Sequence, residues 1–279
     1  MATTISSLID SMGSGPVFVH SDPFRTAKLV APVRDRKAYI GAHLSLLCES
    51  AGARGLWLPA FNYDFPRSRV FDVEASPSQL GPIPEHFRTG AAEWRTPMPI
   101  FSVAGIGAEP RISWGEQADP FGPDSTFARL VAEDGVILYY GETFHYNTIV
   151  HYAERVTGGP YRYDKVFPGT VIMRDGTRAA GSLTYHVRPL GTWLDYDWSG
   201  LLNAALAAGV CQRLDEYPEV LAASARDLCE LWIGEMRDDP LALLDDKTRK
   251  WVEPALEELG RRFLIGDFES PEPAWPHAS

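Results

Sequence analysis

The sequence predicts an α/β protein, because short apolar runs of strand length alternate with helical patterns and are followed by a hairpin. The apolar runs lie at residues 17–19, 56–58 and 136–140. Continuous runs of this length, with glycine or proline beside them, are typical of strands that are covered on both faces. Between residues 165 and 188, apolar and polar residues alternate around Asp175-Gly176, which predicts an antiparallel hairpin.

Helical patterns lie between the predicted strands and dominate the last third of the chain. An apolar stripe that includes Tyr39, Leu44 and Leu47 has the spacing of a helix that ends before Gly52. Apolar residues recur at helical spacing after the hairpin as well, which predicts a helical C-terminal part. The expected helices span residues 5–12, 38–51, 83–89, 122–130, 198–214, 218–237 and 246–263.

Residues 60–99 form a long stretch rich in Pro, Ser, Phe and Arg, with one predicted helix inside it. Such a stretch is more often a functional surface than a simple connection. Ser102 begins another predicted strand. We find no internal repeat and no clear linker, so residues 1–268 are expected to form a single domain, followed by a loose, Pro-rich tail at 269–279.

Charge and composition argue against several classes of binding partner. The 279 residues carry a formal net charge of −11, which disfavours nucleic acid or an anionic membrane as the main partner. No run approaches about 18 apolar residues and no signal peptide is recognisable, so a soluble, cytoplasmic protein is expected. Cys48, Cys211 and Cys229 fall in predicted helices without metal-like spacing, which predicts neither a disulfide nor a metal site.

The strongest candidate for a functional site follows the strand at 136–140. That strand stops at Gly141, and a polar loop leads into Thr148-x-x-His151-x-x-Glu154. If a helix begins at about residue 147 or 148, steps of three bring the hydroxyl, imidazole and carboxylate to nearly one face. Open α/β sheets bind ligands at such strand-to-helix turns.

These three side chains suit the removal of a proton from a weak nucleophile. Neutral imidazole accepts a proton near pH 7, and a carboxylate on its other nitrogen fixes the tautomer. A hydroxyl or helix N-terminal amide stabilises charge on an acyl oxygen. The H-x-x-E spacing alone also fits an ordinary solvated helix surface.

Several short motifs in a fixed order resemble those of the antibiotic N-acetyltransferases, the family of the aminoglycoside 3-N-acetyltransferases. The likeness runs from about residue 17 to at least 163, and more loosely to about 250. The motifs are Val19-His20-Ser21, Pro59-Ala60-Phe61, Phe71-Asp72, Ser76-Pro77-Ser78-Gln79-Leu80-Gly81, Phe87-Arg88, Arg95-Thr96, residues 102–107, residues 122–130, Asn147-Thr148-x-x-His151-x-x-Glu154 and Pro160-Tyr161-Arg162.

This resemblance implies an acetyl-CoA-dependent N-acetyltransferase without a metal. The implied fold is a mixed central sheet flanked by helices on both sides, with a smaller antiparallel piece. His151 matches the family's general base, Glu154 the carboxylate that orients it, and Thr148 a group near the thioester. The residues that the resemblance assigns to the CoA side are His20, Ser21, Arg95, Thr96, Ser102 and Val103. The implied partners are CoA and a small-molecule amine, and a homo-oligomer is compatible with the sequence.

Two departures from the family pattern bear on the cleft and on the acceptor. Met98 stands where the family's Arg-Ser-x-His-Pro motif has histidine, and His145 stands where aminoglycoside-modifying members commonly carry aspartate. The residues expected on the acceptor side are Asp64, Glu142, His145 and Asn147.

The acceptor class stays open at this point. An aminoglycoside, a nucleotide-linked amino sugar and an amine of secondary metabolism are all compatible with the residues, as is a relative that binds CoA without catalysis. The absence of a Gly-x-Ser-x-Gly elbow argues against the usual serine hydrolase.

Overall fold

A seven-stranded mixed sheet organises the chain, in a computed structural model that describes residues 1–141 and 143–270. Its central strands β2, β1 and β6 are parallel, and antiparallel strands flank them on both sides. The strand order is β4 (Trp94–Arg95), β5 (Val103–Ile106), β2 (Leu56–Pro59), β1 (Val17–Ser21), β6 (Val136–Tyr140), β10 (Val220–Ser224) and β9 (Cys211–Arg213).

Alternate residues of the central strands enter two different hydrophobic cores, one on each face of the sheet. Val17 and Val19 pack into one core with helices α1 (Ala2–Asp10), α2 (Arg36–Ala51) and α4 (Pro82–Gly90). Phe18 faces the opposite core, because successive side chains of a strand point to opposite faces. Helices in that second core include α5 (Thr126–Ala132), α6 (Val150–Thr157), α7 (Trp198–Ala207), α8 (Ala225–Asp238) and α9 (Asp246–Leu259).

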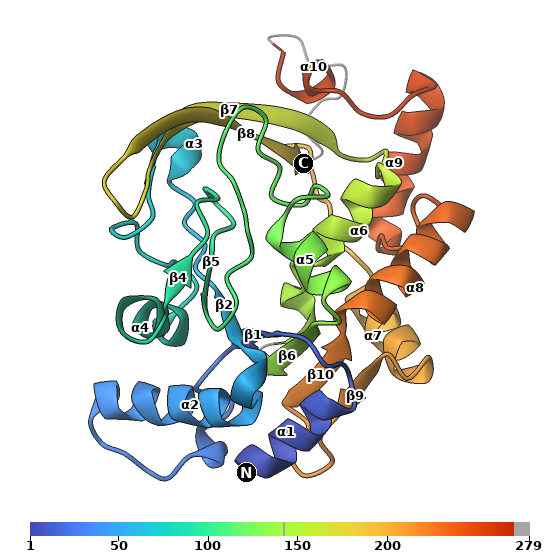
Figure 1. Cartoon of the computed structure of the whole chain (residues 1–279). Helices are drawn as coiled ribbons and strands as arrows, with labels where there is room; N and C mark the ends of the chain where they lie inside the picture. The colour runs from blue at the N-terminus through green and yellow to red at the C-terminus, as the bar shows by residue number, and fades with distance from the viewer. Residues whose placement is uncertain (142, 271–279) are drawn as a thin grey trace.

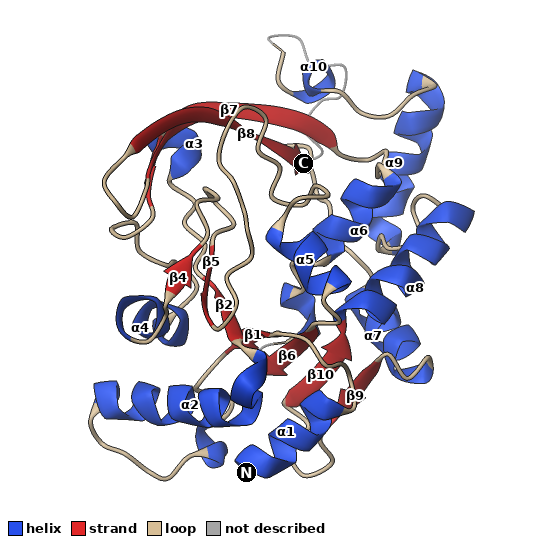
Figure 2. Cartoon of the chain, in the orientation of Figure 1, coloured by secondary structure: helices blue, strands red, loops and turns tan. Residues whose placement is uncertain are grey.

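A second sheet arches over one end of the molecule, well separated from the first (Figure 1). It consists of the long antiparallel hairpin β7 (Tyr163–Ile172) and β8 (Arg178–Val187), which β3 (Val70–Asp72) joins in parallel. The hairpin predicted from alternation at 165–188 is confirmed. Figure 2 shows that the helices gather around the larger sheet while loops connect the two sheets.

The predicted α/β class is confirmed, with helices on both faces of a mixed sheet and a helical C-terminal part. The boundaries after residue 207 were wrong in two places. Helix α7 ends there and Cys211 lies in strand β9, while residues 220–224 form strand β10 before helix α8 begins. Runs of Ala and Leu favour helix locally, but backbone pairing of β10 with β6 and β9 decides the structure here.

The remaining elements are short. They are the 3₁₀ turns η1 (Ala27–Leu29), η2 (Gly52–Arg54) and η3 (Phe144–Tyr146), with helices α3 (Phe65–Ser68) and α10 (Ile265–Phe268). Glu269, the first residue of the expected tail, accepts a hydrogen bond from Tyr163 and pairs with Lys165, whereas 271–279 lie outside the described residues. None of the described helices is long and apolar enough to cross a membrane.

Candidate active site

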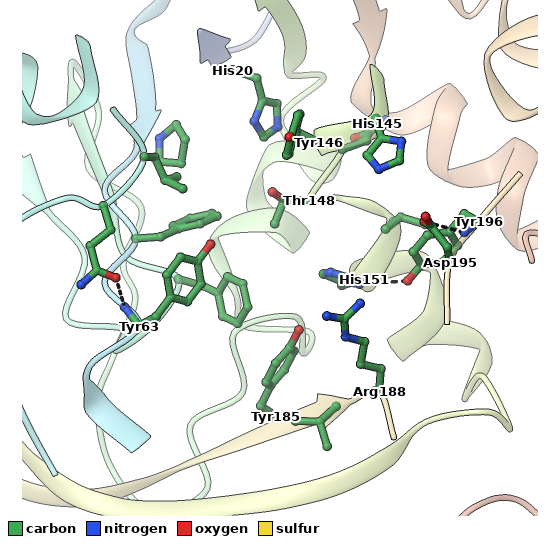
Figure 3. Close-up of a pocket in the computed structure, with 18 of the residues that line it drawn as sticks. His20, Tyr63, His145, Tyr146, Thr148, His151, Tyr185, Arg188, Asp195 and Tyr196 are labelled. Atoms are coloured by element: carbon green, nitrogen blue, oxygen red, sulfur yellow. Dashed lines mark hydrogen bonds between the residues drawn. The ribbon is translucent and has the colours of Figure 1, made fainter. Parts of the chain in front are cut away.

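A cavity of about 750 Å³ lies at the carboxyl ends of β1 and β2, between the large sheet and strand β8. Its walls come from segments that are far apart in the chain (Figure 3). The lining residues are His20, Ser21, Pro59, Phe61, Tyr63, Gln79, Leu80, Pro84, Phe101, His145, Tyr146, Asn147, Thr148, Val150, His151, Arg162, Tyr185, Val187, Arg188, Leu190, Leu194, Asp195, Tyr196 and Trp198.

Gly141 lets the chain leave strand β6 toward this cavity. Its φ is +78°, and a Cβ added there would lie 2.4 Å from the carbonyl oxygen of Asp22. A side chain at this position would therefore be strained by the backbone conformation and would also clash. The turn carries the chain from the buried strand directly into the loop of His145 and Asn147.

Helix α6 begins at Val150, slightly later than the sequence predicted. The residues before it form tight turns instead, since the amide of His151 donates to the carbonyl of Thr148 at 3.2 Å. Thr148 nevertheless lines the same cavity as His151, and Figure 3 shows it between His20 and His151. The expected grouping of the hydroxyl and imidazole at one cavity wall is thus present in the structure.

His151 and Glu154 form a hydrogen-bonded pair one helical turn apart. Nδ1 of His151 lies 2.8 Å from Oε2 of Glu154, whose side chain is fully buried. An ionised carboxylate only accepts hydrogen bonds, so Nδ1 carries the proton and Nε2 holds the free lone pair. The His151 side chain remains 21% exposed, which leaves it accessible from the cavity.

Two further side chains hold the Glu154 carboxylate, and we call His151, Glu154, Arg162 and Tyr196 the Glu154 cluster. Nε of Arg162 lies 2.7 Å from Oε2 of Glu154, and the Tyr196 hydroxyl donates to Oε1 at 2.7 Å. Arg162 also donates to the Tyr196 hydroxyl. Burial acts to raise the pKa of Glu154, but the positive charge of Arg162 and the bond from His151 outweigh it and lower the pKa to about 2.

The same surroundings keep His151 neutral. Burial lowers its pKa below the usual 6.5, and the charge of Arg162 lowers it further, against the opposing effect of Glu154. A neutral imidazole at neutral pH is a base ready to accept a proton. The arrangement therefore provides a buried carboxylate, charged at neutral pH, behind an accessible imidazole.

Ser21 and Asn147, which both line the cavity, carry buried polar atoms. Among the described residues, the hydroxyl of Ser21 and both amide atoms of Asn147 have no hydrogen-bond partner. Buried polar groups are rarely left unpaired, so these two side chains are candidates for a ligand contact in the cavity that they line. His20 lies beside Ser21, stacks on Tyr139, and has its pKa lowered to about 4 by burial.

The other residues expected on the CoA side lie behind the cavity wall. We call Arg95, its four hydrogen-bond partners and Phe71 the Arg95 cluster. Arg95 donates to Ser102 and to the carbonyls of residues 60, 73 and 76, and its guanidinium lies over the ring of Phe71. Thr96 accepts a hydrogen bond from the amide of Val103. Arg95, Thr96, Ser102 and Val103 are all buried and do not line the cavity.

The expected acceptor-side residues are divided in the structure. His145 and Asn147 line the cavity, whereas Asp64 does not and binds Gln79 and Arg67 near its rim. Glu142 lies outside the described residues. Met98, which replaces the family's histidine, is buried in the hydrophobic core.

Sequence reasoning did not assign roles to several lining residues. Arg162 belongs to the quoted Pro-Tyr-Arg motif, which was a usable signal. Tyr185, Arg188, Asp195 and Tyr196 lie in segments with no comparable motif, and only the fold brings them to the cavity.

A profile of the family described as aminoglycoside 3-N-acetyltransferase matches residues 47–221, which is more than half of the chain. The chain belongs to this family. Aminoglycoside N(3)-acetyltransferase VII of Streptomyces paromomycinus is 37% identical over 82 residues, covering 29% of this chain and 28% of the relative. Enzyme VIII of Streptomyces fradiae is 35% identical over 106 residues, 37% of each protein. The matches thus span only about a third of these relatives.

Solved structures of the family share the whole fold. Aminoglycoside acetyltransferase AAC(3)-IVa, as apoenzyme, superposes with a TM-score of 0.64 at 22% identity, over 88% of this chain and 90% of that one. The binary complex of AAC-IIIb with CoASH gives 0.65 at 18% identity, over 85% and 96%. Membership and fold are therefore established by independent comparisons.

Proposed function

We propose that this chain is an acetyl-CoA-dependent N-acetyltransferase that uses His151 as its general base. The observation that carries the proposal is the bond between His151 and the buried, charged Glu154 beside a cavity open to ligands. Such a pair leaves Nε2 as a base whose positive form, once protonated, is stabilised by the carboxylate behind it. Family membership gives the reaction class, and the CoASH complex of AAC-IIIb supports CoA as cosubstrate.

The reaction proceeds by direct acyl transfer. Nε2 of His151 takes a proton from the substrate nitrogen, whose lone pair attacks the thioester carbon of acetyl-CoA. The carbonyl oxygen gains negative charge, and the Thr148 hydroxyl donates a hydrogen bond to it. Collapse of the tetrahedral intermediate breaks the carbon–sulfur bond, and the departing CoA thiolate takes the proton from the imidazolium. No metal and no covalent acyl-enzyme enter the scheme.

We assign the acetyl-CoA side of the cavity to the wall formed by His20 and Ser21, together with Asn147, which was expected on the acceptor side. Their unpaired polar atoms and the neutral His20 ring suit the amide-bearing arm of CoA, which offers both donors and acceptors. Arg95, Thr96, Ser102 and Val103 would then support this side from behind, by fixing the ends of β2 and β5. The acceptor is an amine of the aminoglycoside or amino-sugar type, a class to which family membership points.

Thiol release from acetyl-CoA tests the proposal. The full chain is incubated with acetyl-CoA and a panel of aminoglycosides and amino sugars, and free CoA is measured colorimetrically. Substituting His151→Ala should lower turnover about 100-fold or more, because general-base catalysis contributes at least that much. The variant should keep the melting temperature of the wild type within a few degrees.

Two outcomes would contradict the proposal. A folded His151→Ala variant with unchanged turnover would remove His151 from the mechanism. Saturable CoA binding without amine-dependent thiol release across the panel would identify a binding protein instead of an enzyme.

A further inference from the structure

Arg188 places a positive charge beside the base. It follows directly after strand β8, and its side chain is exposed and lines the cavity. Figure 3 shows it next to His151 and Tyr185, and its charge acts on the pKa of both groups. No motif in the sequence predicted a charge at this place.

The guanidinium of Arg188 has unused hydrogen-bonding capacity. Its one hydrogen bond in the described chain goes to the carbonyl of Leu194 at a long 3.5 Å, and it forms no ion pair with a described carboxylate. A guanidinium carries five N–H donors in a planar fork that matches a carboxylate or phosphate. Arg162, the other arginine of the cavity, is already neutralised by Glu154. Of the two arginines among the described lining residues, Arg188 is thus the one available to a ligand.

Negative charge on the described cavity wall is limited to Asp195. Its Oδ1 accepts hydrogen bonds from the amide of Tyr196 at 2.8 Å and from the indole of Trp198 at 2.9 Å. One fixed carboxylate suits one ammonium group. Among the described lining residues, an acceptor with several ammonium groups would meet this one carboxylate and also the repelling charge of Arg188, which costs free energy.

The position of Arg188 beside His151 favours a contact with the acceptor over a contact with the phosphates of CoA. The base must reach the attacking nitrogen and the thioester, so the part of CoA beside His151 is the thioester end. That end is uncharged, because the pantetheine arm, with its two amides, separates it from the pyrophosphate. An anionic group that meets Arg188 next to His151 therefore belongs to the acceptor.

We propose that the acceptor is an amine that also carries a carboxylate or phosphate group, which Arg188 binds while Asp195 receives a positively charged nitrogen. This inference rests on the proposed function and narrows its acceptor class. It separates this chain from relatives such as the AAC(3)-IVa variants solved with gentamicin or apramycin.

Calorimetric titration of the full chain tests the inference, with and without saturating CoA so that no turnover occurs. The probes are glucosamine, glucosamine 6-phosphate, muramic acid and apramycin. The two anionic amines should bind about 10- to 100-fold more tightly than glucosamine, the range expected for a charge-assisted hydrogen bond. Comparison of glucosamine 6-phosphate with muramic acid decides between phosphate and carboxylate.

Variants of Arg188 sharpen the result. Arg188→Met should remove the advantage of the anionic amines, and Arg188→Glu should reverse the preference in favour of apramycin. Neither change should alter the affinity for CoA. Arg178→Met, at an exposed position at the start of the same strand, should behave as the wild type.

Three results would overturn the inference. These are tighter binding of apramycin than of both anionic amines by the wild type, no advantage of either anionic amine over glucosamine, or a loss of CoA affinity alone in Arg188→Met. A lack of thiol release with every acceptor would refute the proposed function and leave the binding result standing.

Discussion

Arg162 and Arg95 are both buried, but their surroundings are opposite. Arg162 lies beside the candidate active site, whereas Arg95 supports the structure behind it. Arg162 pairs with the charged Glu154, and this interaction, working against burial, raises its pKa well above the usual range. Arg95 is held by carbonyl groups and Ser102, and burial, together with the charge of Arg88, lowers its pKa to about 9. Only the Glu154 cluster reaches the cavity, through His151, Arg162 and Tyr196.

The difference shows how a buried charge can serve either purpose. In the Glu154 cluster, the arginine keeps the carboxylate ionised behind His151, the proposed base, so that the carboxylate stabilises the protonated form of His151. In the Arg95 cluster, a fork of N–H donors ties together the segments that follow strands β2 and β3. Replacing Arg162 should therefore change both the stability and the pH dependence of turnover, whereas replacing Arg95 should change the stability alone.

The largest effect is expected from Arg162→Met. The change leaves the Glu154 carboxylate buried without its cation, which should lower the free energy of unfolding by about 3–5 kcal/mol, measured by urea denaturation. Because Arg162 lowers the pKa of His151, its removal should also move the pH midpoint of turnover upward. Arg162→Met combined with Glu154→Gln should be less destabilised than the single variant. Simple additivity of the two changes would contradict the coupling.

Low pH should destabilise the Glu154 cluster but not the Arg95 cluster. The pKa of Glu154 is lowered to about 2 from an ordinary value of 4.5. Its charged form therefore stabilises the fold above pH 4.5, and this contribution, about 3 kcal/mol, is lost as the pH falls toward 2. The difference in unfolding free energy between wild type and Glu154→Gln, measured at several pH values, should shrink in that window. A constant difference would show that Glu154 does not titrate as stated.

A smaller effect is expected from Arg95→Met. Loss of its hydrogen bonds should lower the free energy of unfolding by about 2 kcal/mol, because buried carbonyls lose a charged donor while the cost of burying the charge disappears. The pH midpoint of turnover should stay unchanged, since Arg95 does not touch the Glu154 cluster. Arg95→Lys should not restore stability, because an ammonium cannot reproduce the planar fork. A raised KM for acetyl-CoA at unchanged stability would instead make Arg95 a CoA ligand.

The two arginines also show which features of the protein could be predicted from its sequence and which could not. Both arginines belong to recognisable motifs, Arg95-Thr96 and Pro160-Tyr161-Arg162, and neither motif says whether its arginine faces a ligand. The His151–Glu154 contact was predictable because three residues in a helix fix their relative position. Strand β10 was missed because its pairing with β6 connects residues 80 to 88 positions apart.

The α/β class, the family, the hairpin and the spacing of His151 and Glu154 could all be predicted from the sequence. Each of these depends on short-range periodicity or on ordered motifs. The folded structure was needed to show that Arg162 and Tyr196 enclose Glu154, that Arg95 lies behind the cavity wall, and that Arg188 and Asp195 both line the cavity. These residues come from separate strands and loops, so only the packing of the two sheets and the helices between them sets their distances.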